Sequence, residues 1–307
     1  MTQLIYLPEV KRDPDSVVTV GTFDGVHEGH KSLIQTVVGK ARKRNARSIV
    51  VSFDPHPREI IDPGFRIKLL TTMEERREIM GDLGVDILVV IPFDRDFSLL
   101  GSDEFVEQII YDKVGLTEFV IGYDHHFGRD RKGSLSTITT LGERLGFDVH
   151  IVKAHEVDKV TVSSTTVRKA LEEKGDVGFA RQFLGRPYRI SGTVVHGDKR
   201  GELMGFPTAN IKPDNKKKVI PQNGVYAVDV LTEGKKYRGM MNIGVRPTFT
   251  GEGRTLEVNI FDFNQDLYGI SLEIYFLDRI RDEKKFAGME ELIAQLENDK
   301  ISCSEAE

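Results

Sequence analysis

The sequence predicts two domains of different architecture, an α/β domain followed by a small antiparallel β-barrel. The chain has 307 residues, which is more than one hydrophobic core usually spans, so two domains are expected. Between residues 17 and 151, short β-branched runs alternate with amphipathic helical stretches, which is the pattern of a parallel sheet covered by helices. After residue 187 the period of the apolar residues changes to two, which favours antiparallel strands.

Five apolar runs are the expected strands of the first domain, because a strand covered on both faces shows no polar alternation. They cover residues 17–20, 48–53, 87–91, 118–121 and 148–152. Helices are expected between them. One should begin near Thr72, since Thr72 and Glu75 match a capping box, and another should follow Ser102.

The boundary between the domains is predicted after Leu184. A helical pattern continues to that residue, and a Gly-Arg-Pro run then interrupts it. The first domain is therefore expected to cover residues 1–184 and the second to cover residues 185–307.

The second domain is expected to close into a barrel, because closure removes exposed strand edges. Its strands are expected at residues 225–230, 237–243, 256–263 and 271–276, with a turn at residues 232–235. One amphipathic helix should follow, and its apolar positions are Met289, Leu292, Ile293 and Leu296.

Composition favours an enzyme that acts on small molecules in a reducing compartment. The net charge of −5 lacks the basic excess expected of a nucleic-acid-binding protein. No apolar run is long enough to cross a bilayer, and the first residues do not resemble a signal peptide. Cys303, the only cysteine, has no partner for an intramolecular disulfide. We therefore expect a cytoplasmic protein without nucleic-acid or membrane partners, and the sequence leaves its oligomeric state open.

The first candidate site follows the strand at residues 17–20. The chain there runs through a glycine-rich turn, GTFDGVHEGH, into a helix with apolar residues at helical spacing. A strand, turn and helix start leaves backbone N–H groups pointing outward beside the positive end of the helix dipole, which attracts phosphate. His27 and His30 lie three residues apart, so both can donate to one phosphate from the same side of the opening turn.

Two histidines at a helix start can also be mere capping or packing residues, and that alternative stays open. A second hydroxyl-rich helix start, VSSTTVR, comes late in the same domain and contains Ser164, Thr165 and Arg168. Two phosphate-binding segments favour a triphosphate between them. The first segment is not a Walker A loop, because its glycines are one residue too close together.

The motif GTFDGVHEGH together with SSTTVR resembles the adenylyltransferase half of bacterial bifunctional riboflavin kinase/FAD synthetases, within the HxGH nucleotidyltransferase superfamily. The resemblance implies a Rossmann-like domain in which the phosphate of FMN attacks the α-phosphorus of ATP and releases pyrophosphate, assisted by Mg²⁺. Positioning and charge stabilisation supply most of the rate in such chemistry. The resemblance also implies that His27 and His30 are catalytic, and that ATP is contacted by Gly21, Phe23, Asp24, Gly29, Ser164, Thr165 and Arg168.

Two further segments of the first domain follow strands, where parallel sheets bind their ligands. The sequence FDPHP contains His56 and resembles a stretch that borders the family's active site, although its prolines can equally serve to end the strand. The sequence GYDHHFG contains Asp124, and the resemblance implies flavin contacts from His56 and Asp124. Family members usually carry an aromatic residue in place of His125, and a surface or packing role for His125 and His126 is favoured over a metal site.

The second domain has its own candidate site. The sequence GFPTAN resembles the PTAN signature of riboflavin kinases, in which the threonine and asparagine bind magnesium and nucleotide phosphate. Thr208 and Asn210 lie two residues apart, so both side chains point the same way from an extended segment and can share one Mg²⁺. Gly197 and Gly201 in the preceding loop would let the backbone approach the ATP phosphates, although such a loop is often only structural.

Glu257 is the candidate base of the kinase reaction. On an alternating strand Leu256 and Val258 take one face and Glu257 takes the other, where its carboxylate can accept the proton of the ribityl 5′-hydroxyl. A solvated strand carboxylate is the alternative. Arg281 lies in the segment RDEKKF, which resembles a family segment expected to fold over the flavin, with a purely structural role as its alternative. Asn259 departs from the histidine that the family usually has.

Together the two sites predict an enzyme that phosphorylates riboflavin to FMN and adenylylates FMN to FAD, with ATP as co-substrate and Mg²⁺ as cofactor. The HxGH motif alone defines only the reaction class, because such domains also act on pantetheine phosphate or nicotinamide mononucleotide, and the barrel motifs supply the flavin. Two alternatives stay open, a non-catalytic flavin-binding regulator and a chain with one active and one relic domain.

Overall fold

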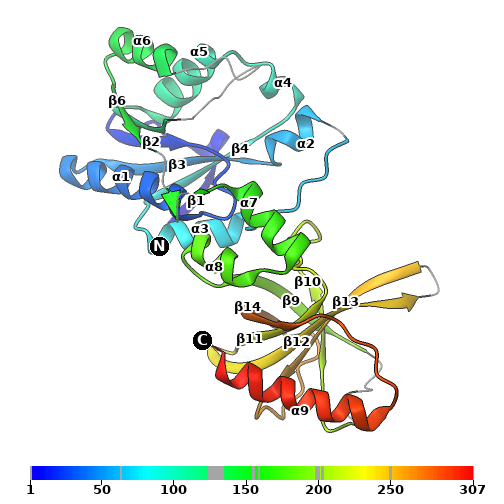
Figure 1. Ribbon diagram of the computed structural model, residues 1–307. Helices are drawn as coiled ribbons and strands as arrows, with labels where there is room; N and C mark the ends of the chain where they lie inside the picture. Colours follow the sequence, from blue (N-terminus) through cyan, green and yellow to red (C-terminus); the bar gives the residue numbers. More distant parts are fainter. Residues whose placement is uncertain are drawn as a thin grey trace. The chain divides into compact units, whose positions relative to one another are not determined.

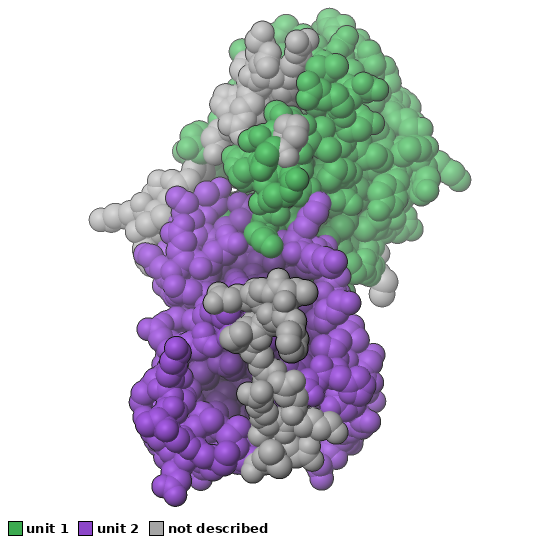
Figure 2. Space-filling model, turned by 90° about the vertical axis from the view of Figure 1, so that its right-hand side faces the viewer, with its two compact units in different colours: residues 1–164 green, residues 165–307 purple. Residues whose placement is uncertain are grey.

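The structure is a computed structural model, and the residues that it describes are 2–62, 64–123, 135–153, 156–157, 160–197, 201, 204–248 and 251–306. The chain divides into two compact units, residues 1–164 and residues 165–307 (Figure 2). The first unit is an α/β domain and the second contains a β-barrel, which confirms the predicted fold class (Figure 1). The domain boundary expected after residue 184 stays a prediction.

The first unit is built on a six-stranded sheet in which every neighbouring pair is parallel. Its strands in spatial order are β1 (Gln3–Tyr6), β4 (Ile87–Pro92), β3 (Arg47–Asp54), β2 (Ser16–Val20), β5 (Glu118–Gly122) and β6 (Asp148–Val152). All five predicted strands are confirmed, whereas the short edge strand β1 was not predicted. The strand order reverses direction at β2, and the carboxyl end of a strand at such a switch point is where open α/β sheets bind ligands.

Both faces of this sheet are buried, as continuous apolar strands require. Val18 and Val20 belong to one apolar cluster, while Val17 belongs to the other. The covering helices are α1 (Glu28–Arg44), α2 (Pro57–Ile61), α3 (Met73–Asp82), α4 (Arg95–Ser98), α5 (Ser102–Glu104), the π-helix η2 (Phe105–Val114) and α6 (Leu135–Leu145). A one-turn 3₁₀-helix η1 (Leu7–Glu9) and a small hairpin, β7 (Glu156–Val157) with β8 (Val160–Thr161), complete the unit.

The capping box predicted at the start of α3 is confirmed. The Thr72 hydroxyl accepts a hydrogen bond from the Glu75 amide at 3.2 Å, and the Glu75 carboxylate accepts one from the Thr72 amide at 2.9 Å. The helix expected after Ser102 is also present, as α5 running into η2. Within the described part of the chain, no helix combines the length and the apolar character that a membrane span requires.

The barrel of the second unit closes completely, as predicted. Its antiparallel strands in spatial order are β10 (Ala209–Pro213), β13 (Gly251–Ile260), β12 (Lys235–Thr248), β11 (Gly224–Thr232), β14 (Ser271–Arg281) and β9 (Tyr188–Val195). The predicted turn between β11 and β12 is confirmed, because Glu233 and Gly234 both have positive φ, as a two-residue hairpin requires. The strand expected at residues 256–263 instead ends at Ile260, since Asp262 has a φ of 54° that no strand accommodates.

Besides its strands, the described part of the second unit contains longer helical segments. They are α7 (Ser164–Lys169), the π-helix η4 (Ala170–Lys174), α8 (Val177–Leu184) and α9 (Met289–Glu305). The final helix α9 is confirmed and packs on β11, β12 and β14 (Figure 1). Its buried residues are Asp299 and Cys303, and Leu296 packs against the same apolar cluster. Met289 was expected on this face and is 62% exposed, so the packed face begins after the first residue of the helix.

Cys303 should be unreactive in the folded protein. Burial, with a smaller contribution from the Asp299 carboxylate, raises the pKa of its thiol to about 12. The thiolate that attacks alkylating reagents is therefore absent at neutral pH. We expect iodoacetamide at pH 8 to label Cys303 only after denaturation in urea, which mass spectrometry of the intact protein can follow. Rapid labelling without denaturant would contradict this packing of α9.

Candidate active sites

The turn after β2 leads directly into α1 and carries the two histidines of the first candidate site. Three of its residues have positive φ, namely Phe23 at 47°, Gly25 at 84° and Val26 at 41°. His27 is the N-cap of α1, and its Nδ1 accepts a hydrogen bond from the His30 amide at 3.3 Å. Nδ1 of His27 therefore caps the helix, which is the alternative role that the sequence left open for these histidines.

The imidazoles of His27 and His30 are stacked, with ring centroids 3.5 Å apart and planes inclined by 17°. Phe23 meets the His30 ring edge-on at a centroid distance of 5.1 Å. His27 is buried and His30 is half-buried. The structure therefore brings both histidines to one side of the first turn of α1, at the carboxyl end of the central strand, as the spacing predicts.

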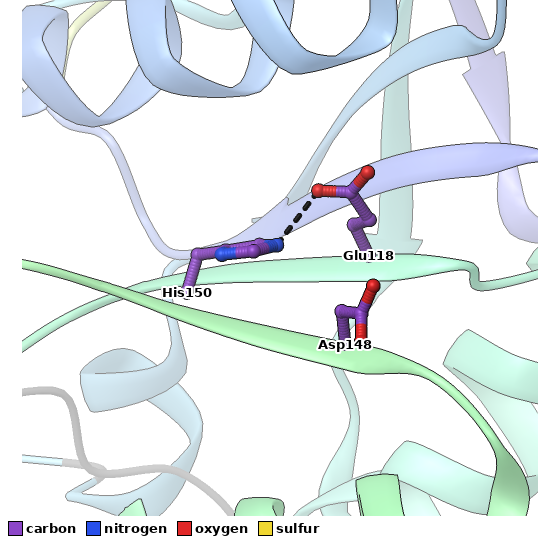
Figure 3. Close-up of side chains that lie close together, drawn as sticks. All are labelled: Glu118, Asp148 and His150. Atoms are coloured by element: carbon purple, nitrogen blue, oxygen red, sulfur yellow. Dashed lines mark ion pairs between the residues drawn. The ribbon is translucent and has the colours of Figure 1, made fainter. Parts of the chain in front are cut away.

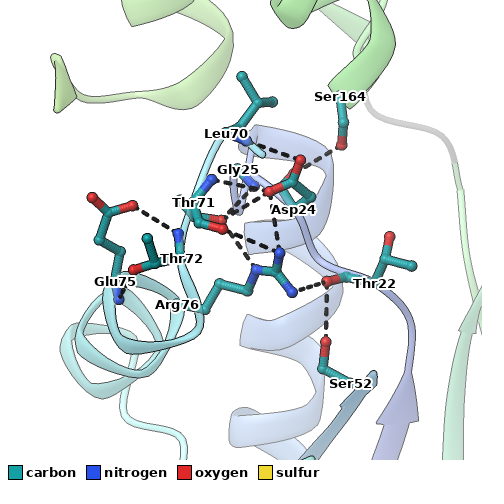
Figure 4. A network of polar contacts seen from close by, with 10 residues as sticks. All are labelled: Thr22, Asp24, Gly25, Ser52, Leu70, Thr71, Thr72, Glu75, Arg76 and Ser164. Atoms are coloured by element: carbon teal, nitrogen blue, oxygen red, sulfur yellow. Dashed lines mark hydrogen bonds and ion pairs between the residues drawn. The ribbon is translucent and has the colours of Figure 1, made fainter. Parts of the chain in front are cut away.

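The Asp24 carboxylate lies completely inside the protein and contacts protein groups (Figure 4). It accepts hydrogen bonds from the amides of Leu70 and Thr71, both at 3.0 Å, and from the Thr71 hydroxyl at 3.2 Å. Arg76 completes the set with an ion pair of 3.2 Å. These contacts give Asp24 a role in shaping the turn.

Ser164 is tied to the same turn, because its hydroxyl donates to the Asp24 carbonyl at 2.8 Å. Of the three candidate residues in the predicted second phosphate-binding segment, Ser164 lies in the first unit, whereas Thr165 and Arg168 belong to the second unit. A joint site of Thr165 and Arg168 with the turn stays a prediction.

Of the two predicted flavin-binding residues of the first domain, the structure describes His56 and does not describe Asp124. His56 follows β3 and is the N-cap of α2, where its Nδ1 accepts from the Arg58 amide at 3.2 Å. The strand β3 neighbours β2, so His56 lies at the same carboxyl edge of the sheet as the His27 turn. Asp124, with His125 and His126, lies outside the described residues.

In the barrel, the structure brings Thr208, Asn210 and Glu257 together. Asn210 lies directly opposite Glu257 in the β10–β13 ladder, so both side chains share one face of the barrel. The Thr208 hydroxyl lies 3.4 Å from the Glu257 carboxylate. Leu256 and Val258 are buried on the other face, which confirms the predicted alternation of this strand. Hydroxyl, amide and carboxylate oxygens are the ligands that Mg²⁺ prefers, so this donor set fits the expected ion.

The two loop glycines lie against this constellation. A Cβ placed on Gly197 would come within 2.0 Å of the Asn210 amide nitrogen, and one on Gly201 would come within 2.2 Å of the Phe206 carbonyl oxygen. No side chain fits at either position without moving its neighbour. The glycines therefore let the loop backbone approach the Thr208–Asn210 segment closely.

Two residues of this face were not assigned from the sequence. Asn242 lies opposite Glu257 on its other side, in the β12–β13 ladder, and only the strand register reveals this. Asn259 is buried and its amide donates to the Pro207 carbonyl at 2.6 Å, which anchors the segment just before Thr208. The alternation of β13, which places residues 257 and 259 on one face, was the signal that could have found it.

Arg281, the third predicted flavin contact, is held by the final helix. Its guanidinium donates three hydrogen bonds to the Asp299 carboxylate, from Nε to Oδ1 at 2.9 Å, from Nε to Oδ2 at 3.0 Å and from Nη2 to Oδ2 at 2.7 Å. The guanidinium also lies 5.7 Å from the centre of the Phe286 ring. These contacts fasten β14 to α9, and a flavin contact of Arg281 stays a prediction.

A third polar cluster lies at the amino ends of β5 and β6, opposite the edge that carries the histidine turn (Figure 3). Ligand atoms of Glu118, Asp148 and His150 lie within 4.8 Å of one another, which is compatible with metal binding. The Lys40 ammonium, however, lies 3.0 Å from both Glu118 and His150, and Arg44 lies 3.5 Å from Glu118. Two cations already neutralise the buried carboxylate, so the cluster is an ion-pair network.

This network should stabilise the protein above acidic pH. Burial by itself would raise the pKa of Glu118, but the hydrogen bond and charge of Lys40, helped by His150 and Arg44, outweigh burial and lower the pKa below 4.5. A lowered pKa stabilises the fold above the unfolded-state pKa, and this stabilisation is lost as pH falls through the folded-state pKa. We expect Glu118→Gln to lower the free energy of unfolding in urea at pH 7, with the difference from wild type shrinking below pH 4.5. A pH-independent difference would contradict the ion-pair account.

Family models match each half of the chain. The model described as FAD synthetase matches residues 9–166, and the model described as riboflavin kinase matches residues 184–306. The first match contains the histidine turn and Ser164, and the second contains Thr208, Asn210 and Glu257.

Curated relatives extend over almost the whole chain. The bifunctional riboflavin kinase/FMN adenylyltransferase of Escherichia coli K12 is 37% identical over 94% of this chain and 92% of its own length. The protein of the same name from Bacillus subtilis strain 168 is 40% identical over 93% of this chain and 90% of its own length.

A solved structure shares the complete two-unit fold. It is named as a macrolide-efflux protein from Streptococcus pneumoniae, is 35% identical, covers 98% of this chain and 99% of its own, and has a TM-score of 0.91. That name differs from the names of the curated relatives, and the likeness supports the fold. One family model covers each half of the chain, and the two curated relatives each match more than nine tenths of the whole chain. The chain therefore belongs to the family of bifunctional riboflavin kinase/FMN adenylyltransferases.

Proposed function

We propose that the two reactions of this family occur at two separate sites of the chain. The chain phosphorylates riboflavin to FMN and transfers AMP from ATP to FMN, which gives FAD and pyrophosphate. We place the kinase reaction on the barrel face that carries Glu257, and adenylyl transfer at the turn after β2. The observation that supports this division best is the joint face of Thr208, Asn210 and Glu257, since each side chain has a distinct part in phosphoryl transfer.

In the kinase reaction Glu257 acts as the base. Its carboxylate accepts the proton of the ribityl 5′-hydroxyl as that oxygen attacks the γ-phosphorus of ATP, and the bond from the γ-phosphorus to the bridging oxygen breaks to release ADP. The adjacent Thr208 hydroxyl fixes the orientation of the carboxylate. Thr208 and Asn210 would hold Mg²⁺, which neutralises charge on the phosphates when bound. Gly197 and Gly201 allow the loop backbone to lie close to these phosphates.

In adenylyl transfer the residues around the turn bind and orient ATP. His27 and His30 stabilise the charge that develops on the α-phosphate as the FMN phosphate attacks it. The turn residues Gly21, Phe23 and Gly29 contact the nucleotide, and Asp24 contributes through the shape of the turn. Ser164, Thr165 and Arg168 bind the β- and γ-phosphates.

Further parts of the proposal rest on the family resemblance or on the sequence pattern and composition. His56, Asp124 and Arg281 are proposed flavin contacts, and the domain boundary is proposed after residue 184. The partners are riboflavin, FMN, FAD and ATP, with no nucleic acid or membrane, and the location is cytoplasmic.

One time course tests the whole assignment. The purified full-length protein is incubated with riboflavin, ATP and Mg²⁺, and the flavins are separated by chromatography at intervals. FMN that rises and then gives way to FAD is the expected result. FMN alone would overturn adenylyl transfer if FMN with ATP also released no pyrophosphate. Bound riboflavin without conversion would overturn both activities in favour of a flavin-binding regulator.

A further inference from the structure

We propose that Arg76 is a positioning residue for adenylyl transfer. Its buried guanidinium holds the turn between β2 and α1 in the one conformation that presents His27 and the start of α1 to the substrate. This inference rests on the proposed function of the first unit. It assigns a task to a side chain that lies outside the histidine motif, on the helix α3.

The turn needs an external constraint, because its backbone is strained. Phe23 and Val26 both have φ values near 45°, at 47° and 41°. L-residues rarely adopt this region, and a β-branched residue such as Val26 does so least readily. Strained residues of this kind persist only where the surroundings determine the conformation strongly, and they concentrate at functional sites. Val26 immediately precedes His27, so a relaxed turn would displace the N-cap of α1.

Arg76 supplies this constraint by binding two points of the turn at once (Figure 4). Its Nη1 donates to the Thr22 carbonyl at 3.0 Å, and its Nη2 donates to the Asp24 carboxylate at 3.2 Å. The same guanidinium donates to the Thr71 hydroxyl and the Thr71 carbonyl, both at 3.1 Å. Arg76 is only 3% exposed, so these contacts form away from water, where hydrogen bonds to charged groups are strongest.

Thr71 completes the clamp from the segment that precedes α3. Its hydroxyl accepts hydrogen bonds from the Gly25 amide at 2.8 Å and from Arg76, and it donates to Asp24 at 3.2 Å. The hydroxyl thus uses its donor and both acceptor positions. Ser52 adds a second donor to the Thr22 carbonyl at 3.1 Å. Residues Thr22, Asp24 and Gly25 of the turn are therefore all held from outside it.

The fork geometry of the guanidinium is what makes this a positioning device. Buried ion pairs are weak evidence for stability, since desolvation offsets much of their attraction. A guanidinium presents parallel donors that reach the Thr22 carbonyl and the Asp24 carboxylate simultaneously, whereas a lysine ammonium is a compact point charge. Arg76→Lys therefore keeps the buried charge but loses the bridge across the turn.

The test compares Arg76→Lys with a matched change on the same helix. Thr72→Ala removes the N-cap of α3, which costs stability, and the Thr72 hydroxyl bonds to the amide of Glu75 in its own helix. In the full-length protein we measure kcat and the KM for ATP with supplied FMN, thermal unfolding, and riboflavin kinase activity. At a temperature where both variants are folded, Arg76→Lys should lose about 100-fold in kcat, the size of effect expected from a displacement of about 1 Å. Thr72→Ala should stay within about twofold, and kinase activity should be unchanged in both.

Equal kcat losses in the two variants at equal folded fraction would show that Arg76 only supports the fold. If Arg76→Lys does not fold, Thr71→Val and Thr71→Ser replace it. Valine keeps the shape of threonine without the hydroxyl, and serine keeps the hydroxyl. Low kcat in Thr71→Val with near-normal kcat in Thr71→Ser supports the clamp, and the same kcat in both overturns it. A wild-type protein that makes no FAD from FMN would instead contradict the proposed adenylyl-transfer function itself.

Discussion

Glu257→Ala should abolish FMN formation and leave the conversion of supplied FMN to FAD unchanged. The variant removes the carboxylate that we propose as the acceptor of the 5′-hydroxyl proton, and general-base catalysis contributes about 10²- to 10⁴-fold to such rates. It also removes the oxygen that lies 3.4 Å from the Thr208 hydroxyl, so the remaining donor set for Mg²⁺ is less well held. None of the residues proposed for adenylyl transfer lies on the barrel strand β13 that carries Glu257, so that reaction should not respond.

The measurement is the rate of each flavin conversion in separate assays with riboflavin and with FMN. Glu273→Ala is a suitable control, because Glu273 is also a barrel-strand carboxylate, on β14, and pairs with Arg189 at 2.8 Å. The control should retain FMN formation. Loss of both activities in a folded Glu257→Ala protein would refute the division of labour between the units.

His30→Ala should have the reverse effect and stop the pathway at FMN. His30 stacks on His27 at the start of α1. We propose that a ring N–H of His30 stabilises the charge that develops on the α-phosphate. The loss of one such donor reduces kcat by about 10²- to 10³-fold in comparable sites. The barrel does not contain His30, so phosphorylation of riboflavin should continue at the wild-type rate.

Pyrophosphate release with FMN and ATP measures this effect directly. His150→Ala serves as the matched control, because His150 lies on β6 in the same unit but at the opposite edge of the sheet. It should leave pyrophosphate release close to wild type. A His30→Ala protein that makes FAD at a normal rate would show that the histidine motif is assigned to the wrong task.

The sequence alone predicted the elements whose signals are local. The capping box of α3 joins Thr72 to Glu75 over three residues, and the turn before Lys235 depends on two adjacent positions. The five predicted strands of the first sheet are recognisable as continuous apolar runs, because strands that are buried on both faces need apolar residues on both. The placement of His27 and His30 on one side of the helix start follows in the same way from their spacing of three.

Other features depend on which strands become neighbours, and local signals do not carry that information. The edge strand β1 has only four residues, and its pairing with β4 joins Gln3 to Ile87. Asn242 lies opposite Glu257 only because of the β12–β13 register. A one-residue shift in register would send its side chain to the barrel interior.

Asp24 shows most clearly which information is missing from the sequence alone and comes only from the tertiary structure. The motif alone predicts a nucleotide contact there, yet the carboxylate is buried against partners 46 to 52 residues later in the chain. The sequence determined the fold class, the order of the elements and the positions of the chemical groups, because these follow from periodicity and short-range spacing. Only the tertiary structure decided which of those groups are buried against distant partners, because burial and long-range hydrogen bonds arise when distant segments pack together.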